Sequence, residues 1–598
     1  MKKIVLLAAL LAGCGGKAVF GLSSSNDNDP QALAKALDLR QMSAAPKPIG
    51  GSARAYVVTS GKPRHLIAFD LAGEKAAWNV AADVQSRVAV GGDFVVAREG
   101  TDLVARSASD GAVRWKMPID GQFVGAAADD KRAYVVTQTG TDQKPTWYLI
   151  ALDGGSGKQL WRTPSTGQLG APAAQGGLVM APFLTQWLSI LDGATGAQLT
   201  RVRSTDDEIT FAMTTSDAAW FGSKRSVVRL DEKAATGARG TSTTGMAKIP
   251  AQLEKATYAP DGFDAVQAGY SASDRVRILW RADAKGDAWK WQGGGVAVHY
   301  FRYVLGLDEA GAVRWAYSHP KVELVASAHT GAAIAAVSAG GEVIALDPAT
   351  GAVRAHAQLD TGGAPVIGAT FDADGWSPSG AGEPPSTVQA LVAIARDRDA
   401  RFEGVKELAV GTLAKLPGEQ VTRDLLAMLA DERTSAKLKE TVIGVLASRD
   451  DPAGLPALIE ALGVKSDVIA GTEPIAVGAV ARAVGALAKQ PLDEKQKAAA
   501  VDALIGQLRA PSTSVGDAVD VVHALAALGG AAAKAPLRTY LLVYRTDAEF
   551  AKADALVAAT VDATLAAGAD DRELVRFVAD DARTQPAVAD YAKKALAR

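Results

Sequence analysis

The sequence has one cysteine and almost no net charge. Cys14 is the only thiol, so no disulfide can form within the chain, and its cores must be stable without one. Basic and acidic side chains number 64 and 66, which gives a formal net charge of -2 at pH 7. A chain this balanced has neither the basic patch that binds nucleic acid nor the polybasic segment that binds an anionic membrane. We therefore expect no nucleic-acid partner.

Long apolar runs are absent as well. The run from Ile4 to Leu11 is too short to span a bilayer as a permanent helix, and charged residues interrupt the alanine-rich stretches near the C-terminus. Hydrophobic residues still make up 48% of the 598 residues, and charged residues make up 22%. This is an ordinary globular balance, with enough apolar material for several large cores. The sequence predicts several domains and no membrane-spanning helix.

Sequence signals for catalysis and metal binding are also lacking, so we predict no catalytic residue, no metal site and no cofactor. No Gly-x-Ser-x-Gly turn marks a nucleophile, and no His-x-x-x-His or Cys-His set indicates zinc. Gly293–Gly295 predicts a turn between strands, because no helix follows to bind a phosphate. Asp206–Glu208 is expected to be a solvated loop. We expect His299 at the edge of a strand or lining the pore, and His319 in a turn. The six histidines are His65, His299, His319, His329, His356 and His523.

The N-terminus predicts export and lipidation. Lys2 and Lys3 precede the short apolar run, and small residues follow it, which is the pattern of a secretory signal peptide over residues 1–13. The tetrad Leu-Ala-Gly-Cys that ends at Cys14 resembles the bacterial lipobox, and the resemblance implies that Cys14 is acylated and becomes the mature N-terminus. Gly15, in place of an aspartate, then indicates the outer membrane. The alternative is an ordinary cleavage site that happens to contain a cysteine.

Residues 14–51 are predicted to form a lipidated N-terminus and a flexible tether. The polar run from Ser23 to Asp29 cannot bury enough apolar surface to order itself. A short helix-like piece runs from Gln31 to Leu39, and two prolines follow it. A tether of this kind would set how far the next domain can lie from the membrane.

Residues 52–371 contain a repeat of about 40 residues. Its clearest copy, Leu149–Trp161, reads Leu-Ile-Ala-Leu-Asp-Gly-Gly-Ser-Gly-Lys-Gln-Leu-Trp. Successive repeat units are separated by 37, 46, 39, 39, 77 and 39 residues. The 77-residue step contains Ile278–Asp283 followed by Trp289 and Trp291, which we interpret as an eighth unit, with seven units as the alternative. The aspartate position of the other units falls at Asp70, Ser107, Asp153, Asp192, Asp231, Asp308 and Asp347.

Each repeat unit predicts two strands joined by a tight turn. The side chain of Asp153 can accept bonds from nearby backbone amides, and Gly157 can take a positive φ in the turn. Trp161 then offers a flat apolar surface to the neighbouring unit. The spacing is typical of a four-stranded propeller blade, and a closed ring of blades leaves few exposed edges. We predict an eight-bladed β-propeller, with seven blades or an open sandwich of hairpins as the alternatives.

The repeat is similar to the pyrroloquinoline-quinone-type repeat, whose pattern is Leu-x-Ala-Leu-Asp-x-x-(Thr/Ser)-Gly-x-x-x-Trp. Leu149–Trp161 matches this pattern best, Val343–Ala355 keeps everything but the tryptophan, and Leu66–Trp78 keeps the aspartate and the tryptophan. Dehydrogenases of that family enclose their cofactor beneath a disulfide of adjacent cysteines and bind calcium. This chain cannot form that disulfide, since it has one cysteine, and no calcium-binding spacing of acidic residues stands out.

From about Thr387 the apolar period becomes helical. Leu455–Leu462 carries apolar residues at i, i+3, i+4 and i+7, and the spacing returns from Val501 and from Leu537. Helix pairs at this period resemble HEAT or armadillo-like repeats, whose stacking buries a continuous core. We expect an α-solenoid over residues 387–598, with an irregular helical bundle as the alternative. The Gly- and Pro-rich stretch 372–386 predicts a linker before it.

The propeller region also resembles the propeller lipoproteins of the outer-membrane β-barrel assembly machinery, which share the lipobox and the eight-unit propeller. The resemblance implies a non-enzymatic scaffold in outer-membrane protein assembly. Such a scaffold would be anchored by its lipid to the outer membrane, face the periplasm and bind other envelope proteins. The broad surfaces of two repeat arrays suit this role. The alternatives are a quinone-dependent dehydrogenase-like enzyme and a receptor for a glycan or small ligand. The helical array is a departure from those lipoproteins.

Overall fold

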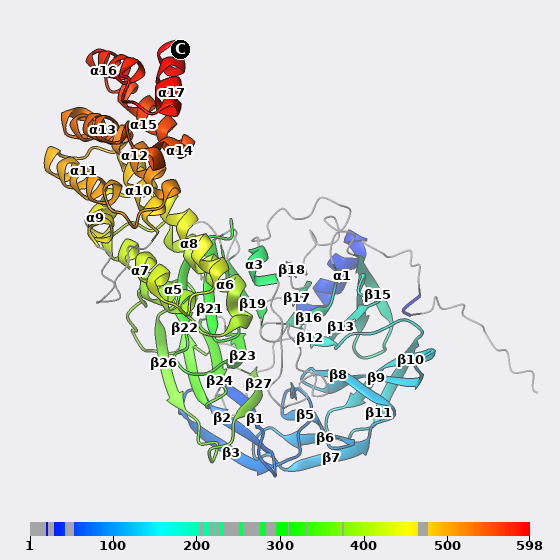
Figure 1. Cartoon of the computed structure of the whole chain (residues 1–598). Helices are drawn as coiled ribbons and strands as arrows, with labels where there is room; N and C mark the ends of the chain where they lie inside the picture. Colours follow the sequence, from blue (N-terminus) through cyan, green and yellow to red (C-terminus); the bar gives the residue numbers. More distant parts are fainter. Residues whose placement is uncertain are drawn as a thin grey trace, which may run out of the picture. The chain divides into compact units, whose positions relative to one another are not determined.

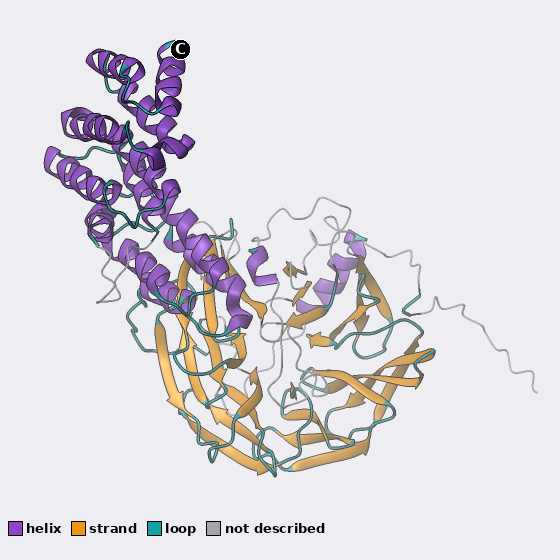
Figure 2. Ribbon diagram, viewed as in Figure 1, coloured by secondary structure: helices purple, strands orange, loops and turns teal. Residues whose placement is uncertain are grey.

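A computed structural model describes residues 19–21, 29–41, 53–203, 208–214, 219–222, 227–230, 250–254, 276–282, 295–308, 310–330, 332–372, 376–464 and 476–598. The chain divides into two compact units, Met1–Pro385 and Ser386–Arg598. The described part of the first unit is built mainly of strands, with the helices α1 (Pro30–Gln41) and α3 (Ala251–Glu254), and the second unit is built of helices (Figures 1 and 2).

The strands of the first unit form seven sheets, which we number in chain order. Six of them have four strands, and sheet 5 has three within the described residues. Sheets 1 to 3 consist of β27 (Val366–Asp372), β1 (Arg54–Thr59), β2 (His65–Asp70) and β3 (Lys75–Ala81); β4 (Ala89–Val90), β5 (Phe94–Glu99), β6 (Asp102–Ser107) and β7 (Val113–Pro118); and β8 (Gln122–Ala128), β9 (Arg132–Thr141), β10 (Lys144–Asp153) and β11 (Gln159–Ser165). Sheets 4 and 5 consist of β12 (Ala173–Gln175), β13 (Leu178–Phe183), β14 (Trp187–Asp192) and β15 (Gln198–Arg203); and β16 (Phe211–Thr214), β17 (Ala219–Gly222) and β18 (Val227–Arg229). Sheets 6 and 7 consist of β19 (Val276–Ala282), β20 (Gly295–Tyr300), β21 (Tyr303–Asp308) and β22 (Val313–Ser318); and β23 (Leu324–His329), β24 (Ile334–Ser338), β25 (Glu342–Leu346) and β26 (Val353–Gln358).

The sheets are the blades of a β-propeller. The first strands of neighbouring sheets contact one another in order, from β27 to β4, β8, β12 and β16, and again from β19 to β23 and back to β27. Strand β27, the last of the unit, pairs with β1, the first, so that Arg54 lies opposite Asp372 and Thr59 opposite Val366. Sheet 1 therefore contains both the first strand and the last strand of the propeller, and neither end of the array is left as a separate, unpaired strand.

The described residues therefore form seven sheets, as in the seven-bladed alternative, and not eight. Ile278, which we assigned to an eighth unit, lies in β19 and pairs with Val298 of β20. It belongs to the first strand of sheet 6, whose outer hairpin carries Asp308. The interpretation failed because the repeat pattern marks the outer hairpin of a blade, whereas Ile278–Ala282 is an inner strand. Trp289 and Trp291 lie outside the described residues.

The turn chemistry predicted from the repeat is confirmed. The Oδ1 atom of Asp153 accepts hydrogen bonds from the backbone amide of Ser156, at 2.8 Å, and from its hydroxyl, at 2.7 Å. The hydroxyl bond is the main cause of a lowered pKa of the Asp153 carboxyl. Gly157 takes a φ of 73°, which a side chain would strain. Asp192 and Asp347 bind their turns through Thr195 and Thr350 in the same way.

Tryptophans join each of several blades to the next. The Nε1 atom of Trp161 donates to the carbonyl of Gly193 in the turn of the next sheet, at 3.0 Å. The ring also covers Gly196 of that turn, where an added Cβ would lie 2.8 Å from Cδ2. The same donation recurs three more times among the described residues, from Trp78 to Ala108, Trp115 to Gly154 and Trp315 to Pro348. A buried indole thus satisfies its one donor while it packs against the neighbouring turn.

The second unit is a two-layer α-solenoid in its described residues. Its helices are α5 (Thr387–Ala395), α6 (Glu403–Leu413), α7 (Glu419–Ala430), α8 (Ala436–Ser448), α9 (Leu455–Gly463), α10 (Val477–Leu487), α11 (Glu494–Leu508), α12 (Val515–Leu528), α13 (Gly530–Tyr544), α14 (Ala548–Lys552), α15 (Asp554–Ala566), α16 (Ala569–Asp580) and α17 (Pro586–Leu596). One layer stacks α7, α9, α11, α13 and α16 in succession, and the other stacks α6, α8, α10, α12, α15 and α17. The helical spacing predicted from Leu455 is confirmed, since Leu455, Leu458 and Leu462 are buried on one face of α9.

Candidate functional site

The predicted lipidation site, Cys14, lies outside the described residues, but the segment that follows it contacts the propeller. Phe20 is buried, with its ring centroid 5.5 Å from that of Phe183 at the end of β13. It belongs to the core between sheets 3 and 4, which also contains Tyr134 and Leu191. Residues 14–51 were expected to form a flexible tether. Within that range, residues 19–21 reach the apolar interior between two blades.

Helix α1 packs on the opposite side of the same sheet. Leu33 and Ala36, at 0% and 1% exposure, join the core between sheets 4 and 5. That core includes Ile190 of sheet 4 and Phe221 of sheet 5, and α1 contacts both β13 and β15. The N-terminal segment therefore contributes to the apolar cores on both faces of sheet 4. We call Phe20, Leu33 and Ala36 the N-terminal clasp.

The sequence of sheet 4 explains why this blade has room for a helix. Thr200 occupies the position at which Trp161 and other repeat units carry tryptophan. It lies opposite Ile190 in the register, on the face that α1 covers. Because threonine is much smaller than tryptophan, the apolar contact that an indole makes elsewhere is made here by residues of the N-terminal helix.

A buried arginine binds the backbone next to Phe20. Arg201 is 0% exposed, and its Nη1 donates to the carbonyl of Gly21, next to Phe20. Its guanidinium also lies 5.3 Å from the ring centroid of Trp187. A buried charge is tolerated when hydrogen bonds and aromatic contacts replace its hydration. The carbonyl of Gly21 is one of these partners, so the N-terminal segment helps to stabilise the interior of sheet 4.

One histidine has hydrogen bonds that resemble those of a catalytic base, but substrate cannot reach it. His299 lies in β20 and Ser327 in β23, and the Ser327 Oγ is 2.7 Å from the His299 Nδ1. The Nε2 atom is 2.7 Å from the carbonyl of Phe301, which only accepts, so Nε2 carries the proton and Nδ1 accepts from the serine. Both residues are 0% exposed. We expected His299 at the edge of a strand or lining the pore, and this prediction is wrong. The side chain is buried and joins sheet 6 to sheet 7 through Ser327.

His319 and His356 lie on either side of one glutamate. The predicted turn at His319 is confirmed, since its Nδ1 accepts from the backbone amide of Val322 at 3.2 Å. Its Nε2 is 2.5 Å from Glu342, and the Nε2 of His356 is 3.6 Å from the same carboxylate. Burial and the charge of Glu342 raise the pKa of Tyr317 beside them to about 12. Within the residues that the structure describes, no group of three or more His, Cys, Asp or Glu side chains is placed to hold a metal ion.

Two loops singled out by the sequence are only partly described. Gly295 is the first residue of β20, while Gly293 and Gly294 lie outside the described residues. Glu208 is exposed, as expected of a solvated loop, but Asp206 and Asp207 are not described. Neither loop supplies a described cluster of polar groups that could bind a ligand.

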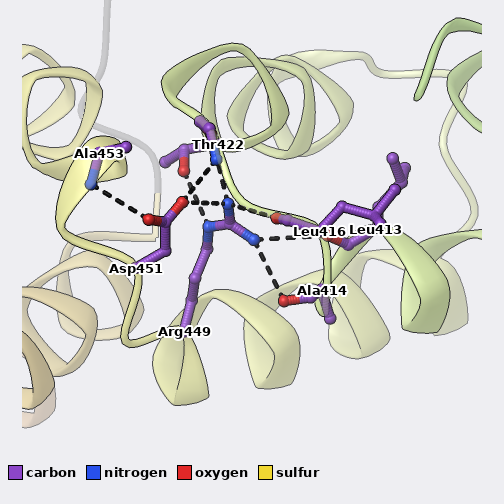
Figure 3. Close-up of polar contacts among 8 residues, drawn as sticks. Leu413, Ala414, Leu416, Thr422, Arg449, Asp451 and Ala453 are labelled. Atoms are coloured by element: carbon purple, nitrogen blue, oxygen red, sulfur yellow. Dashed lines mark hydrogen bonds and ion pairs between the residues drawn. The ribbon is translucent and has the colours of Figure 1, made fainter. Parts of the chain in front are cut away.

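The polar cluster around Arg449 in the helical unit is structural. Arg449, with a side chain 2% exposed, donates to the hydroxyl of Thr422 at 2.9 Å and to Asp451 at 2.8 Å (Figure 3). Its other bonds go to carbonyls at or just beyond the C-terminal end of helix α6, namely those of Leu413, Ala414, Leu416 and Gly418. A cation at the C-terminal end of a helix complements the helix dipole. Since all its donors are used within the protein, Arg449 joins successive helix pairs and has none left for a ligand.

Apolar side chains are exposed on both repeat arrays. Val113 and Leu160 lie on the outer strands β7 and β11 and are 52% and 44% exposed. Val543 on α13 and Phe577 on α16 are 61% and 47% exposed. Single exposed apolar residues are common, so they mark positions for contact and do not by themselves define a site. No helix in the described part of the chain has the length and apolarity to cross a membrane.

Comparison with known proteins finds a similarity in the propeller region. The family model described as outer membrane protein assembly factor BamB matches residues 62–219. No curated protein matches the chain. One similar solved structure is BamB from Moraxella catarrhalis, with 18% identity, 51% of this chain and 82% of that chain covered, and a TM-score of 0.32. Another is the Cps50 (Swd1) propeller domain of Myceliophteria thermophila, with 12% identity, 48% of this chain and 93% of that chain covered, and a TM-score of 0.30. A third is Sqt1 of Saccharomyces cerevisiae, with 11% identity, 54% of this chain and 85% of that chain covered, and a TM-score of 0.31. Residues 62–219 thus form a propeller region similar to that of the BamB family.

Proposed function

We propose that this protein is a lipid-anchored, non-enzymatic scaffold of the bacterial cell envelope that binds other envelope proteins through its propeller and its solenoid. The observation that carries the proposal is the match of residues 62–219 to the family of an outer-membrane protein assembly factor. A role in the assembly of outer-membrane proteins follows by analogy with that family. The partners and the outer-membrane location are part of the proposal.

The arrangement of polar groups supports a role in binding other proteins over a role in catalysis. The serine and histidine that could form a nucleophile and base are both 0% exposed, so they cannot meet a substrate. The other large polar cluster, around Arg449, is saturated by backbone carbonyls and Asp451. Both repeat arrays instead present long rows of strand and helix surface, which is how propellers and solenoids bind other chains.

The lipid anchor rests on the sequence around Cys14, with its short apolar run and small residues before the cysteine. A single acyl chain holds a protein to a membrane only marginally, whereas several hold it stably. The tri-acylated cysteine that the lipobox implies would therefore be a sufficient anchor.

Photo-crosslinking in intact cells tests the scaffold proposal. A benzoylphenylalanine placed at Val113 on the propeller or at Val543 on the solenoid should crosslink to envelope proteins that mass spectrometry can identify. The matched control places the same probe at Phe402, which is 2% exposed. Recovery of uncrosslinked chain from both exposed positions, with no envelope protein attached, would count against a scaffold.

A further inference from the structure

We infer that the N-terminal clasp sets the orientation of the propeller on the membrane, so that the β13–β14 end of sheet 4 faces the bilayer. The inference rests on the proposed acylation of Cys14. The new element is the surface of the propeller that meets the membrane. The partner of this surface is a lipid bilayer, and Phe20, Gly21 and the residues of α1 hold the propeller in this orientation.

Few residues separate Cys14 from the point where the chain is buried in the propeller. Phe20 is the sixth residue after Cys14, and a fully extended chain spans at most about 3.3–3.6 Å per residue, so the two lie at most about 20 Å apart. Were the whole segment free as far as Ala53, the 39 residues from 14 to 53 could extend to roughly 130 Å. A buried Phe20 therefore shortens the reach about sixfold and keeps the attachment point on the propeller within about 20 Å of Cys14.

The contacts of the segment determine which part of the propeller lies within that reach. The ring of Phe20 packs on Phe183, whose ring in turn lies 5.6 Å from that of Trp187. Leu184, in the turn between β13 and β14, packs against the same core. This turn is therefore the part of sheet 4 nearest to the lipid. Among the described sheets, the contacts lead from sheet 4 through sheets 3 and 2 to sheets 1 and 7, which therefore lie on the far side of the propeller and should face away from the membrane.

Contacts on both faces of sheet 4 hold the segment in place. Phe20 lies in the core on one side and Leu33 lies in the core on the other. Arg201 adds a polar contact between them through the carbonyl of Gly21. Release of the segment would expose apolar side chains on both faces and would take an acceptor from a buried guanidinium, so the attached state is favoured.

Energy transfer to labelled lipid tests the orientation in the full, acylated chain. One fluorophore is attached through Gln186→Cys in the β13–β14 turn. The matched control is Gly340→Cys in the corresponding β24–β25 turn of sheet 7, where an added Cβ meets nothing closer than 3.6 Å. Cys14 does not react when its sulfur is acylated. The protein is bound to vesicles of phosphatidylethanolamine and phosphatidylglycerol that carry an acceptor dye on a headgroup.

We expect transfer at position 186 to exceed transfer at position 340 by about twofold or more, because a short arm allows only one side to approach the lipid. Equal transfer at the two positions in acylated, vesicle-bound protein overturns the orientation and leaves the anchor standing. Protein that carries no acyl chain and does not bind vesicles refutes the anchor, and the orientation with it.

A release variant provides a second test. Phe20→Ser combined with Leu33→Ser should bring the two transfer efficiencies together while palmitate labelling of Cys14 stays unchanged. Lys35→Ser, at an exposed position of α1, should leave the difference intact. A difference that persists in the double variant would show that the clasp does not set the orientation. If the double variant unfolds, the comparison of positions 186 and 340 in the otherwise unaltered chain still decides.

Discussion

Substitution of Gly351 tests whether tryptophan stacking on the next turn stabilises the propeller. Gly351 has a φ of 71°, and a Cβ added there would lie 2.4 Å from Cε3 of Trp315. A left-handed backbone costs an L-residue about 1–2 kcal/mol, and forcing a methyl group against a buried ring costs a further 1–3 kcal/mol or so. We therefore expect Gly351→Ala to lower the free energy of unfolding of the propeller by about 2–5 kcal/mol.

A double-mutant cycle separates the two costs. Trp315→Ala alone should destabilise the propeller by about 3–5 kcal/mol, since it removes a ring that is 3% exposed. In that background Gly351→Ala should cost only the backbone strain of about 1–2 kcal/mol. The coupling between the two substitutions should then be about 1–3 kcal/mol.

The chain offers a matched control. Gly363 has a similar φ of 81°, but an added Cβ would meet nothing within 4 Å. Gly363→Ala should therefore cost about 1–2 kcal/mol and show no coupling to Trp315→Ala. Urea unfolding followed by circular dichroism measures the propeller transition. Equal costs for the two glycine substitutions, or strict additivity of Gly351→Ala with Trp315→Ala, would show that the Trp315 ring does not pack tightly against this turn.

Two further predictions concern buried and turn-forming polar groups. Arg449→Ala should destabilise the helical unit by about 3–5 kcal/mol in thermal unfolding, because it takes the cation away from Asp451 and the side-chain donor away from several carbonyls. Arg433→Ala, whose side chain is 63% exposed, should change stability by no more than about 0.5 kcal/mol. Equal effects of the two substitutions would contradict the role of Arg449. The lowered pKa of Asp153 contributes stability at pH above its unfolded value, and that contribution is lost as the pH falls through the folded pKa. Ser156→Ala removes the main cause of the lowering, so the loss of the urea midpoint between about pH 7 and about pH 3 should shrink, and an unchanged loss would show that this bond is unimportant.

The blade architecture could be predicted because its signals are local. Asp153, Gly157 and Trp161 lie within nine residues of one another, and each has the conformation or contact that its chemistry suggests. The helical period from Leu455 is likewise local. The blade number was harder, because the inner strand β19 carries no turn motif and its role depends on pairing with β20.

The clasp was missed because its residues lie in a segment of polar composition. Phe20 lies in a short apolar stretch directly before a run of serine, asparagine and aspartate, and Leu33, Ala36 and Leu37 give the helix only one turn of apolar i, i+3, i+4 spacing. One signal was available, namely Thr200 at a position where tryptophan is usual. A blade without its indole needs another apolar side chain to fill the gap, but the sequence does not say which distant segment supplies it.

The burial of His299 could not be predicted either. Its sequence neighbours Tyr300 and Tyr303 are consistent with an edge or a pore. Its position instead follows from the packing of sheet 6 on sheet 7, which brings Ser327 within 2.7 Å of Nδ1. Contacts between residues of different blades depend on how the blades pack side by side and not on local sequence.

Mass spectrometry of the N-terminal peptide of the protein purified from bacterial membranes decides whether a lipid on Cys14 anchors it. We expect a peptide that begins at Cys14 and carries acyl chains on that residue. A peptide that retains the residues before Cys14, or one that begins there with a free thiol, would contradict a lipid-anchored scaffold.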